Sequence, residues 1–301
     1  MITRYLFEKD NQPIVIGLGF FDCIHLGHKA LIEEVQREAK RLNAMSSICT
    51  FQNDPNLKFN LPPQIYTSHE RSLILQNLNL DFLILANFDE KFMNTEPELF
   101  LNELTNNFNI VGVVVGSDYT YGKKAGGNVD TLTKYFGKLG VKVTVVPFEK
   151  TNNEKLATRN LKNLITTGKI EELNACLSEP YFMFGTVIHG MHRGTQIGFP
   201  TANIEANKET LKIADGIYAT KIYIDDVPYY GMTNVGPKPT FDEYTYSVET
   251  YLLDFNQDIY GKEVKIEFFK KTRDVAKFDG VLGLQMQLKH DAKEIREYFG
   301  V

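Results

Sequence analysis

The first half of the chain alternates short apolar runs with amphipathic segments, and this alternation restricts the fold more than any other feature. Apolar and β-branched residues dominate the runs, which therefore read as buried strands. Strands that alternate with helices form a parallel sheet covered on both faces, so we predict a doubly wound, Rossmann-like α/β domain. The predicted strands are 13–19, 46–51, 81–88, 110–118 and 141–148, and the predicted helices between them include 67–78, 96–105 and 130–139.

Beyond Pro180 the pattern changes to short β segments separated by turn residues. Such spacing predicts a closed antiparallel β-barrel. A helical connector, residues 161–177, precedes Pro180, which we take as the boundary between domains 1–179 and 180–301. The chain ends in a predicted helix after the N-cap candidate Asp279, with one apolar face packed on the barrel. That face comprises Val281, Leu284, Leu288, Ile295 and Phe299.

The composition indicates the class of protein and its partners. At 301 residues with 43% hydrophobic content, the chain can fill two cores. A net charge of −5 provides no broad basic surface, which argues against a nucleic-acid-binding function. Three cysteines without a CxxC pattern suit a reducing compartment, and the sequence shows neither a signal peptide nor an apolar run of ~18 residues. We therefore predict a cytoplasmic protein with small-molecule substrates, no nucleic-acid partner and no membrane association.

A pair of histidines follows the first predicted strand. FFDCIHLGH at 20–28 reads as a tight loop between a strand and a helix, where anions bind at the helix N-terminus. His25 and His28, together with the helix dipole, would hold a triphosphate and stabilise charge on a transferring phosphorus. The alternative interpretation is a pair of ordinary surface histidines.

GTQIGFPTANI at 194–204 carries a second candidate site. Gly194 and Gly198 bracket a turn, and Pro200 fixes φ before the polar residues Thr201 and Asn203. Positions i and i+2 of an extended segment point to the same side, so a hydroxyl and a carboxamide oxygen would converge. Such hard oxygen ligands suit Mg²⁺ that carries a nucleotide phosphate. The alternative is a glycine- and proline-containing loop that ends in a polar strand.

The same stretch resembles the signature of the riboflavin kinase module, and further pieces of that module follow in order. They are GIYA at 216–219, TNVGPKPTF at 233–241, VETYLLDF at 248–255, IYGKEVKIEFF at 259–269 and TR at 272–273. The resemblance implies a barrel domain that phosphorylates riboflavin to FMN with ATP and Mg²⁺.

This resemblance also implies roles for single residues. Glu249 matches the catalytic glutamate that deprotonates the ribityl 5′-hydroxyl, with a solvated charge on a strand as the alternative. Thr201 and Asn203 match the ligands of Mg²⁺–ATP. Phe241 and Tyr251 would stack on the isoalloxazine ring, with packing in the barrel as the alternative. Arg273 matches a family arginine near the active site, for which we predict flavin binding; the alternative is a surface arginine on a loop between a strand and a helix. The predicted ATP-binding positions are Gly190, Gly194, Gly198, Pro200 and Asn234.

The loop GFFDCIHLGH at 19–28 resembles the HxGH-containing motif of the nucleotidylyltransferase superfamily. It is similar to the GNFDGVHLGH form, which opens the FMN adenylyltransferase half of bacterial bifunctional FAD synthetases. The resemblance implies that the N-terminal domain converts FMN and ATP to FAD. It also implies that Gly19, Asp22 and Gly27 bind ATP beside His25 and His28.

The glycine- and lysine-rich segment 119–128, YTYGKKAGGN, fails the spacing of a Walker A loop. It resembles instead the family's GxDFxFGxxRxG element, which implies that Asp118 contacts the flavin. Ala125 stands where that element has arginine.

Two other motifs of this half depart from the family pattern. Asn53 and Asp54 replace a proline and a histidine, and an aspartate near ATP phosphates would repel them. In the serine- and threonine-rich ISSTxIR motif only the hydroxyl of Thr158 is kept, with Arg159 and Lys162 as substitute phosphate ligands. Our hypothesis is an N-terminal domain that keeps its fold and histidines but adenylylates FMN weakly or not at all.

Three functional interpretations remain open at this point. The first is a bifunctional enzyme that makes both FMN and FAD. The second is a riboflavin kinase with a vestigial N-terminal domain. The third is a flavin- or nucleotide-binding paralogue without turnover, which the nearly complete kinase motif set disfavours.

Overall fold

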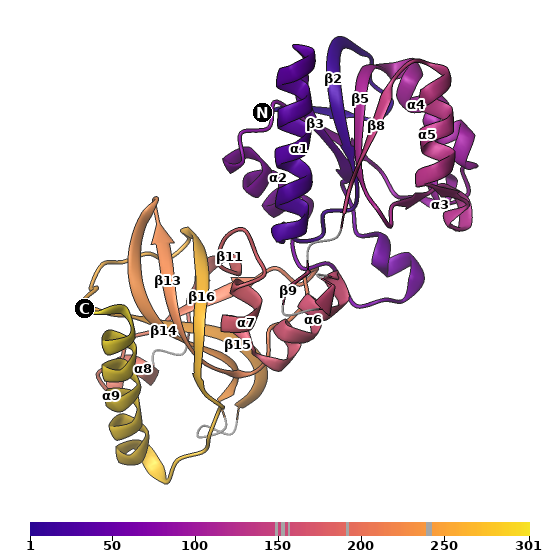
Figure 1. Ribbon diagram of the computed structural model, residues 1–301. Helices are drawn as coiled ribbons and strands as arrows, with labels where there is room; N and C mark the ends of the chain where they lie inside the picture. Colours follow the sequence, from indigo (N-terminus) through magenta and orange to yellow (C-terminus); the bar gives the residue numbers. More distant parts are fainter. Residues whose placement is uncertain (148–149, 152–153, 156, 191–192, 239–242) are drawn as a thin grey trace. The chain divides into compact units, whose positions relative to one another are not determined.

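The computed structural model describes residues 1–147, 150–151, 154–155, 157–190, 193–238 and 243–301. The chain divides into two compact units, Met1–Thr158 and Arg159–Val301 (Figure 1). Within the described residues, no helix is both long enough and apolar enough to cross a membrane.

The first unit is built on a parallel sheet with the strand order β1-β4-β3-β2-β5-β8, which confirms the predicted doubly wound fold. The edge strand β1 was not predicted, because it is short and largely exposed and so lacks the apolar run of the other strands. The bounds are β1 Ile2–Tyr5, β2 Asp10–Leu18, β3 Met45–Phe51, β4 Phe82–Ala86, β5 Phe108–Gly116 and β8 Lys142–Val146.

Helices cover both faces of this sheet: α1 and α2 lie on one face, and α4 and α5 on the other (Figure 1). Helix α2 begins with a capping box at Thr67 and Glu70, since each side chain accepts from the other's backbone N–H. The bounds are α1 Leu26–Leu42, α2 Ser68–Asn77, α3 Glu90–Met93, α4 Pro97–Asn107 and α5 Val129–Lys138, with short elements η1 Pro55–Phe59, β6 Thr120–Tyr121, η2 Lys123–Ala125, β7 Gly127–Asn128, β9 Lys150–Thr151 and β10 Glu154–Lys155.

The second unit contains the predicted closed antiparallel barrel, with the strand order β11-β12-β15-β14-β13-β16. A chain of hydroxyl groups crosses its interior, where Thr233 Oγ1 lies 2.7 Å from Thr220 Oγ1 and 2.8 Å from Thr250 Oγ1. These hydrogen bonds satisfy buried polar groups. The bounds are β11 Phe182–Ile188, β12 Ala202–Ala206, β13 Gly216–Ile224, β14 Val227–Lys238, β15 Glu243–Leu252 and β16 Glu263–Arg273.

Helices α6 (Thr158–Thr167), α7 (Ile170–Asn174), α8 (Arg193–Gln196) and α9 (Gly280–Phe299) accompany the barrel. The connector helices contact it through Asn174, whose Nδ2 donates to Phe268 O at 2.8 Å. The C-terminal helix α9 packs on the barrel through Leu288, Ile295 and Phe299, as predicted. The prediction for Val281 is wrong: it lies in the first turn of α9, outside the packed segment, and is 49% exposed.

Candidate active sites

The first candidate site lies at the carboxyl ends of β2 and β5. The chain runs from β2 through β3 to β4 on one side of the sheet and then returns to β5 on the other side of β2. At such a switch point the loops after neighbouring strands diverge and leave a crevice. A pocket of about 870 Å³ lies there, and its lining includes the predicted residues Gly19, His25, Gly27, His28, Asp118 and Thr158.

The two histidines of this pocket are held by the start of α1. His25 is the N-cap, and its Nδ1 accepts from the backbone N–H of His28 at 3.1 Å. His28 Nδ1 lies 2.5 Å from the Cys23 carbonyl oxygen, to which it donates. In the neutral rings these bonds leave an N–H donor on Nε2 of His25 and a lone pair on Nε2 of His28.

Both histidines are neutral at physiological pH. Burial, with a further contribution from His28, lowers the pKa of His25 from 6.5 to about 3. Burial lowers the pKa of His28 to about 4. In the free pocket the two imidazole rings therefore carry no charge. An anion that enters the pocket raises their pKa, and the rings can then gain protons.

A strained residue fixes the loop that carries the histidines. Phe21 has a φ of 50°, although it is not a glycine, and it is only 1% exposed. Its ring lies 4.8 Å from the ring of His28. Gly19 is required beside it, because an added Cβ would lie 2.9 Å from the Phe21 ring. Strain of this kind persists where the surrounding structure determines the backbone, often at functional sites.

Asp22, which the resemblance implied for ATP binding, lies below the loop and is 1% exposed. Its Oδ1 accepts from the backbone N–H of Ile65 at 2.6 Å. The buried guanidinium of Arg71 is nearby, and Asp22 and Asp54 counteract the lowering of its pKa by burial. This geometry gives Asp22 a role in holding the loop, and its contact with ATP stays a prediction.

Asn53 and Asp54, the residues expected to weaken the site, both hold backbone groups. Asn53 Oδ1 accepts from the N–H of Phe88 at 2.7 Å, and its Nδ2 donates to the Phe88 carbonyl at 3.0 Å. Asp54 is 7% exposed and accepts from the N–H groups of Asn56 at 2.9 Å and Gln64 at 2.8 Å. The Asp54 carboxylate is therefore engaged by backbone groups and is not among the residues that line the pocket; its repulsion of phosphates stays a prediction.

Aromatic residues that were not predicted as part of the site form one wall of the pocket. Phe51 packs edge to face on Phe88 at 5.1 Å and on Phe92 at 5.6 Å between ring centroids. Tyr119 and Tyr121 continue the wall with stacked rings 5.7 Å apart. Phe51 and Phe88 end or follow strands that were predicted, so their common place at the carboxyl edge was the signal available in the sequence.

Positive charge at this pocket comes from a short lysine-containing turn. Lys123 and Lys124 are the only Lys or Arg residues among its described lining residues. Lys123 Nζ lies 3.2 Å from Glu96 Oε1, whereas Lys124 makes no ion pair within the described part of the chain. Lys124 and Ala125 have φ values of 53° and 54°, so the turn is strained at consecutive residues.

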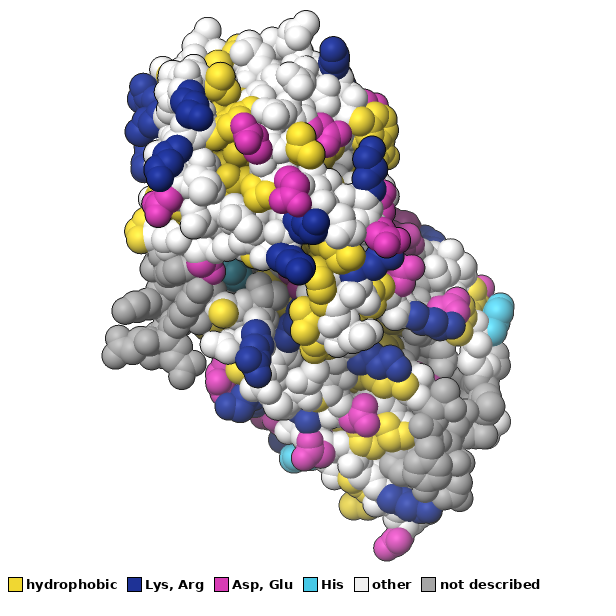
Figure 2. Space-filling view, turned by 90° about the vertical axis from the view of Figure 1, so that its right-hand side faces the viewer, with side chains coloured by type: hydrophobic (Ala, Val, Ile, Leu, Met, Phe, Trp, Pro, Cys, Tyr) yellow, Lys and Arg dark blue, Asp and Glu magenta, His cyan; other side chains and the backbone are white. Residues whose placement is uncertain are grey.

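The other predicted phosphate-binding residues of the FMN adenylyltransferase motifs lie at the start of α6. Thr158 lines the pocket, while Arg159 and Lys162 follow on α6 in the second unit. Elsewhere on the surface, Lys and Arg side chains are interspersed with Asp and Glu on the face shown in Figure 2.

The second candidate site is a row of residues across neighbouring barrel strands. Asn203 on β12 lies opposite Glu249 on β15, and Glu249 lies opposite Asn234 on β14. Directly opposite residues project from the same face, with Cβ atoms roughly 4.5–5.5 Å apart. The alternate residues Val248 and Thr250 are buried, so the row that contains Glu249 lies on the outer face of the barrel. The structure thus brings together the predicted base, a predicted metal ligand and a predicted ATP ligand.

A glycine turn delivers the metal-ligand candidates to this row. Gly194 O accepts from the backbone N–H groups of Ile197 at 3.1 Å and Phe199 at 2.8 Å, and Gly198 has a φ of 80°. A Cβ on Gly194 would lie 3.4 Å from Thr201 Oγ1.

The side chain of Asn203 packs directly against Gly190, so both metal-ligand candidates lie beside glycine backbone. Pro200, which completes the predicted turn, is exposed.

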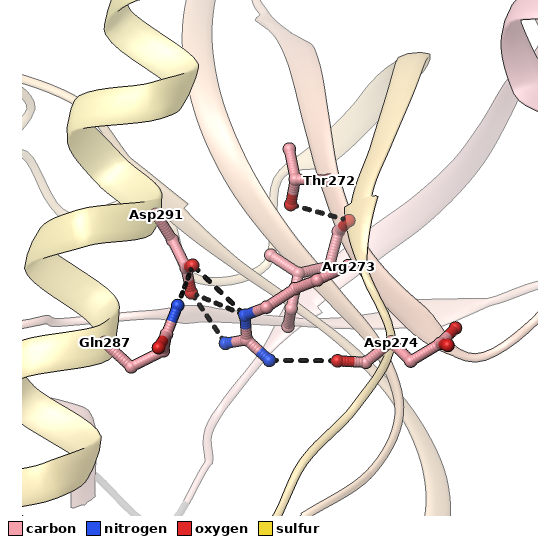
Figure 3. Close-up of polar contacts among 6 residues, drawn as sticks. Thr272, Arg273, Asp274, Gln287 and Asp291 are labelled. Atoms are coloured by element: carbon pink, nitrogen blue, oxygen red, sulfur yellow. Dashed lines mark hydrogen bonds and ion pairs between the residues drawn. The ribbon is translucent and has the colours of Figure 1, made fainter.

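The predicted flavin-binding residues of the barrel unit lie in separate environments. The Tyr251 ring packs edge to face on Phe199, 5.0 Å between centroids, beside α9. Arg273 binds Asp291 on α9, as Figure 3 shows, with Nε 3.1 Å from both carboxylate oxygens. Phe241 lies outside the described residues. Their contacts with flavin remain predictions.

Comparison with known proteins accounts for both halves. A family model described as riboflavin kinase matches residues 177–299, and one described as FAD synthetase matches residues 7–160. A bifunctional riboflavin kinase/FMN adenylyltransferase of Listeria monocytogenes is 36% identical over 291 residues, 95% of this chain and 92% of that protein. The protein of that name from Bacillus subtilis is 33% identical over 304 residues, 98% of this chain and 96% of its own length.

The fold is also found as a whole in a solved structure. A crystal structure titled macrolide-efflux protein from Streptococcus pneumoniae superposes with a TM-score of 0.89 at 30% identity, over 98% of this chain and 99% of that chain. Together, the two family models and the relatives that match nearly the full length confirm the resemblance seen in the motifs. This chain belongs to the family of bifunctional riboflavin kinase/FMN adenylyltransferases.

Proposed function

We propose that this protein makes flavin cofactors in two steps. The barrel unit phosphorylates riboflavin to FMN with Mg²⁺ and ATP, and the α/β unit transfers AMP from ATP to FMN to give FAD. The observation that carries the first step is the register of Asn203, Glu249 and Asn234 on neighbouring strands. The three cysteines are buried and form no disulfide in the described part of the chain, which suits a reducing compartment, so we assign both steps to the cytoplasm.

In the kinase step, Glu249 is the general base. It takes the proton of the ribityl 5′-hydroxyl as that oxygen attacks the γ-phosphorus of ATP, and ADP leaves. Phosphoryl transfer needs little covalent chemistry from the protein, so most of the rate comes from positioning of the phosphates and the hydroxyl. The turn at Gly194–Phe199 and the outer-face row provide fixed groups for that positioning.

The residues present fit a magnesium ion. Thr201 and Asn203 offer a hydroxyl and a carboxamide oxygen, which are hard ligands, and each side chain lies against glycine backbone. Bound between them and the nucleotide, the ion would neutralise phosphate charge.

In the adenylyltransferase step, a phosphate oxygen of FMN attacks the α-phosphorus of ATP, and pyrophosphate leaves. The Nε2–H of His25 donates to a phosphate oxygen, and His28 becomes a donor when the bound polyphosphate raises its pKa. Lys124 and the N-terminus of α1 add positive potential, and the wall at Phe51, Phe88 and Phe92 takes the isoalloxazine ring.

One incubation tests both steps. The purified protein receives riboflavin, ATP and Mg²⁺, and chromatography separates FMN from FAD. We expect both products, loss of both in Glu249→Gln, and loss of FAD alone in His28→Asn. FMN without FAD would support a kinase with a vestigial N-terminal domain. Riboflavin binding without either product would support the paralogue without turnover.

A further inference from the structure

The row that carries Glu249 continues around the barrel to Arg273. Asn234 on β14 lies opposite Ile217 on β13, and Ile217 lies opposite Arg273 on β16. Thr272, next to Arg273, donates from Oγ1 to the Ile217 carbonyl at 3.1 Å (Figure 3). Arg273 therefore stands at a fixed register from the proposed base, at the point where β16 ends and the segment 274–279 leads to α9.

All three guanidinium nitrogens of Arg273 are engaged within the protein (Figure 3). Nε and NH2 donate to the carboxylate of Asp291, with NH2 2.6 Å from Oδ2, and NH1 donates to the Asp274 carbonyl at 3.0 Å. The guanidinium carbon also lies 5.4 Å from the centroid of the Phe278 ring. Arg273 thus ties the barrel to both ends of the connecting segment and to α9.

Asp291 is the buried centre of this arrangement. It is 1% exposed, and Gln287 Nε2, one turn earlier on α9, donates to its Oδ1 at 2.8 Å. A buried carboxylate with a bidentate arginine and a further donor has a narrowly defined position. The pair therefore fixes the rotation and height of α9 on the barrel.

The same helix reaches the glycine turn of the kinase site. Gln285 Nε2 donates to the Ile197 carbonyl at 3.1 Å. Phe199, at the end of that turn, packs in one cluster with Ile295 of α9. Contacts thus run without interruption from Arg273 through Asp291 and α9 to the turn that precedes Thr201.

We propose that Asp291 is a positioning residue of the kinase reaction: it holds α9 on Arg273 so that Gln285 sets the Gly194–Phe199 turn for the phosphates of ATP. It touches neither substrate. This inference rests on the proposed kinase function. It adds Asp291 as a residue that acts on the reaction through α9 and the Gly194–Phe199 turn. The substrate mainly affected is Mg²⁺–ATP, because the turn leads directly to Thr201 and Asn203.

The test is the steady-state kinetics of FMN formation by Asp291→Asn, an isosteric change that removes the charge. We expect the KM for Mg²⁺–ATP to rise about tenfold, while kcat and the KM for riboflavin change less than threefold; a tenfold change corresponds to about 1.4 kcal/mol. Gln285→Met should shift the same parameter. Because both variants act through one helix, the double variant should raise the KM for Mg²⁺–ATP by less than the product of the two single increases.

Glu297→Gln provides the matched control, since it makes the same change on the same helix in an exposed pair with Lys293. Circular dichroism and the unfolding temperature verify folding, and if Asp291→Asn does not fold, Gln285→Met carries the test.

A folded Asp291→Asn, or in its place Gln285→Met, that keeps the KM for Mg²⁺–ATP within twofold of wild type overturns the proposal. A rise confined to the KM for riboflavin overturns the route through the turn. If the unchanged chain forms no FMN, the proposed function itself fails.

Discussion

The imidazole rings of His25 and His28 stack with centroids 3.7 Å apart and an interplanar angle of 11°. Two protonated rings at this distance would repel each other, and burial already holds both pKa values low, near 3 and 4. The pair is therefore stable as neutral rings. It provides a site whose charge depends on the arrival of an anion.

The low pKa values of this histidine pair predict that the free energy of unfolding depends on pH in the acid range. In the unfolded chain both histidines return to a pKa near 6.5, so between pH ~6.5 and pH ~4 the unfolded state binds more protons than the folded state. The free energy of unfolding should therefore fall as the pH falls through this window. Replacement of both histidines by asparagine should flatten that part of the slope in calorimetric unfolding of the full chain. The exposed His290→Asn is the control, and an unchanged slope in the double variant would contradict the low pKa values.

Asp54→Ala separates two views of the altered FQNDP motif. Because the Asp54 carboxylate accepts from two backbone N–H groups in a buried place, its loss should cost about 1–3 kcal/mol of unfolding free energy. The rate of FAD formation should not rise. Asp89→Ala, which removes an exposed N-cap of α3, should cost less and serves as the comparison. Faster FAD formation by Asp54→Ala would restore the idea that Asp54 repels ATP.

The elements whose signals lie in a local sequence pattern were predicted correctly. The central parallel strands were predicted from their apolar runs, and the helix at 67–78 was predicted as well, because these signals lie within a few residues. It did not reveal that the Asp54 carboxylate turns toward Gln64, ten residues away, or that Arg273 meets Asp291 eighteen residues on. Those partners are chosen by tertiary packing, which one sequence does not display. The Arg273–Asp291 pair is the clearest example, since the motif pointed to Arg273 but gave no sign of its partner on α9.

Lys124→Met tests the source of positive charge in the pocket that we propose for the adenylyltransferase step. The histidines are neutral and Lys123 is paired with Glu96, so Lys124 is the lysine of the lining that we expect to meet a phosphate. Loss of one hydrogen bond to a charged group costs about 1.5–3 kcal/mol, so the kcat/KM for FAD formation should fall at least tenfold. FMN formation should not change. Lys134→Met, an exposed change on α5, is the control, and equal rates for both variants would exclude Lys124 as a ligand.

Gly190→Ala tests whether Asn203 must keep its place against the backbone. An added Cβ would collide with the Asn203 carboxamide, which must then move away from the row that contains Glu249. A displacement of about 1 Å in a positioning group can cost about 10²-fold, so we expect the kcat/KM for FMN formation to fall by that order. The Mg²⁺ concentration needed for half-maximal rate should rise as well, because the displaced side chain is a proposed ligand of the ion. Gly283→Ala on α9 is the matched control, since its Cβ would meet only Phe278 at 3.8 Å. A folded Gly190→Ala with the wild-type rate and Mg²⁺ requirement would show that Asn203 does not hold the metal.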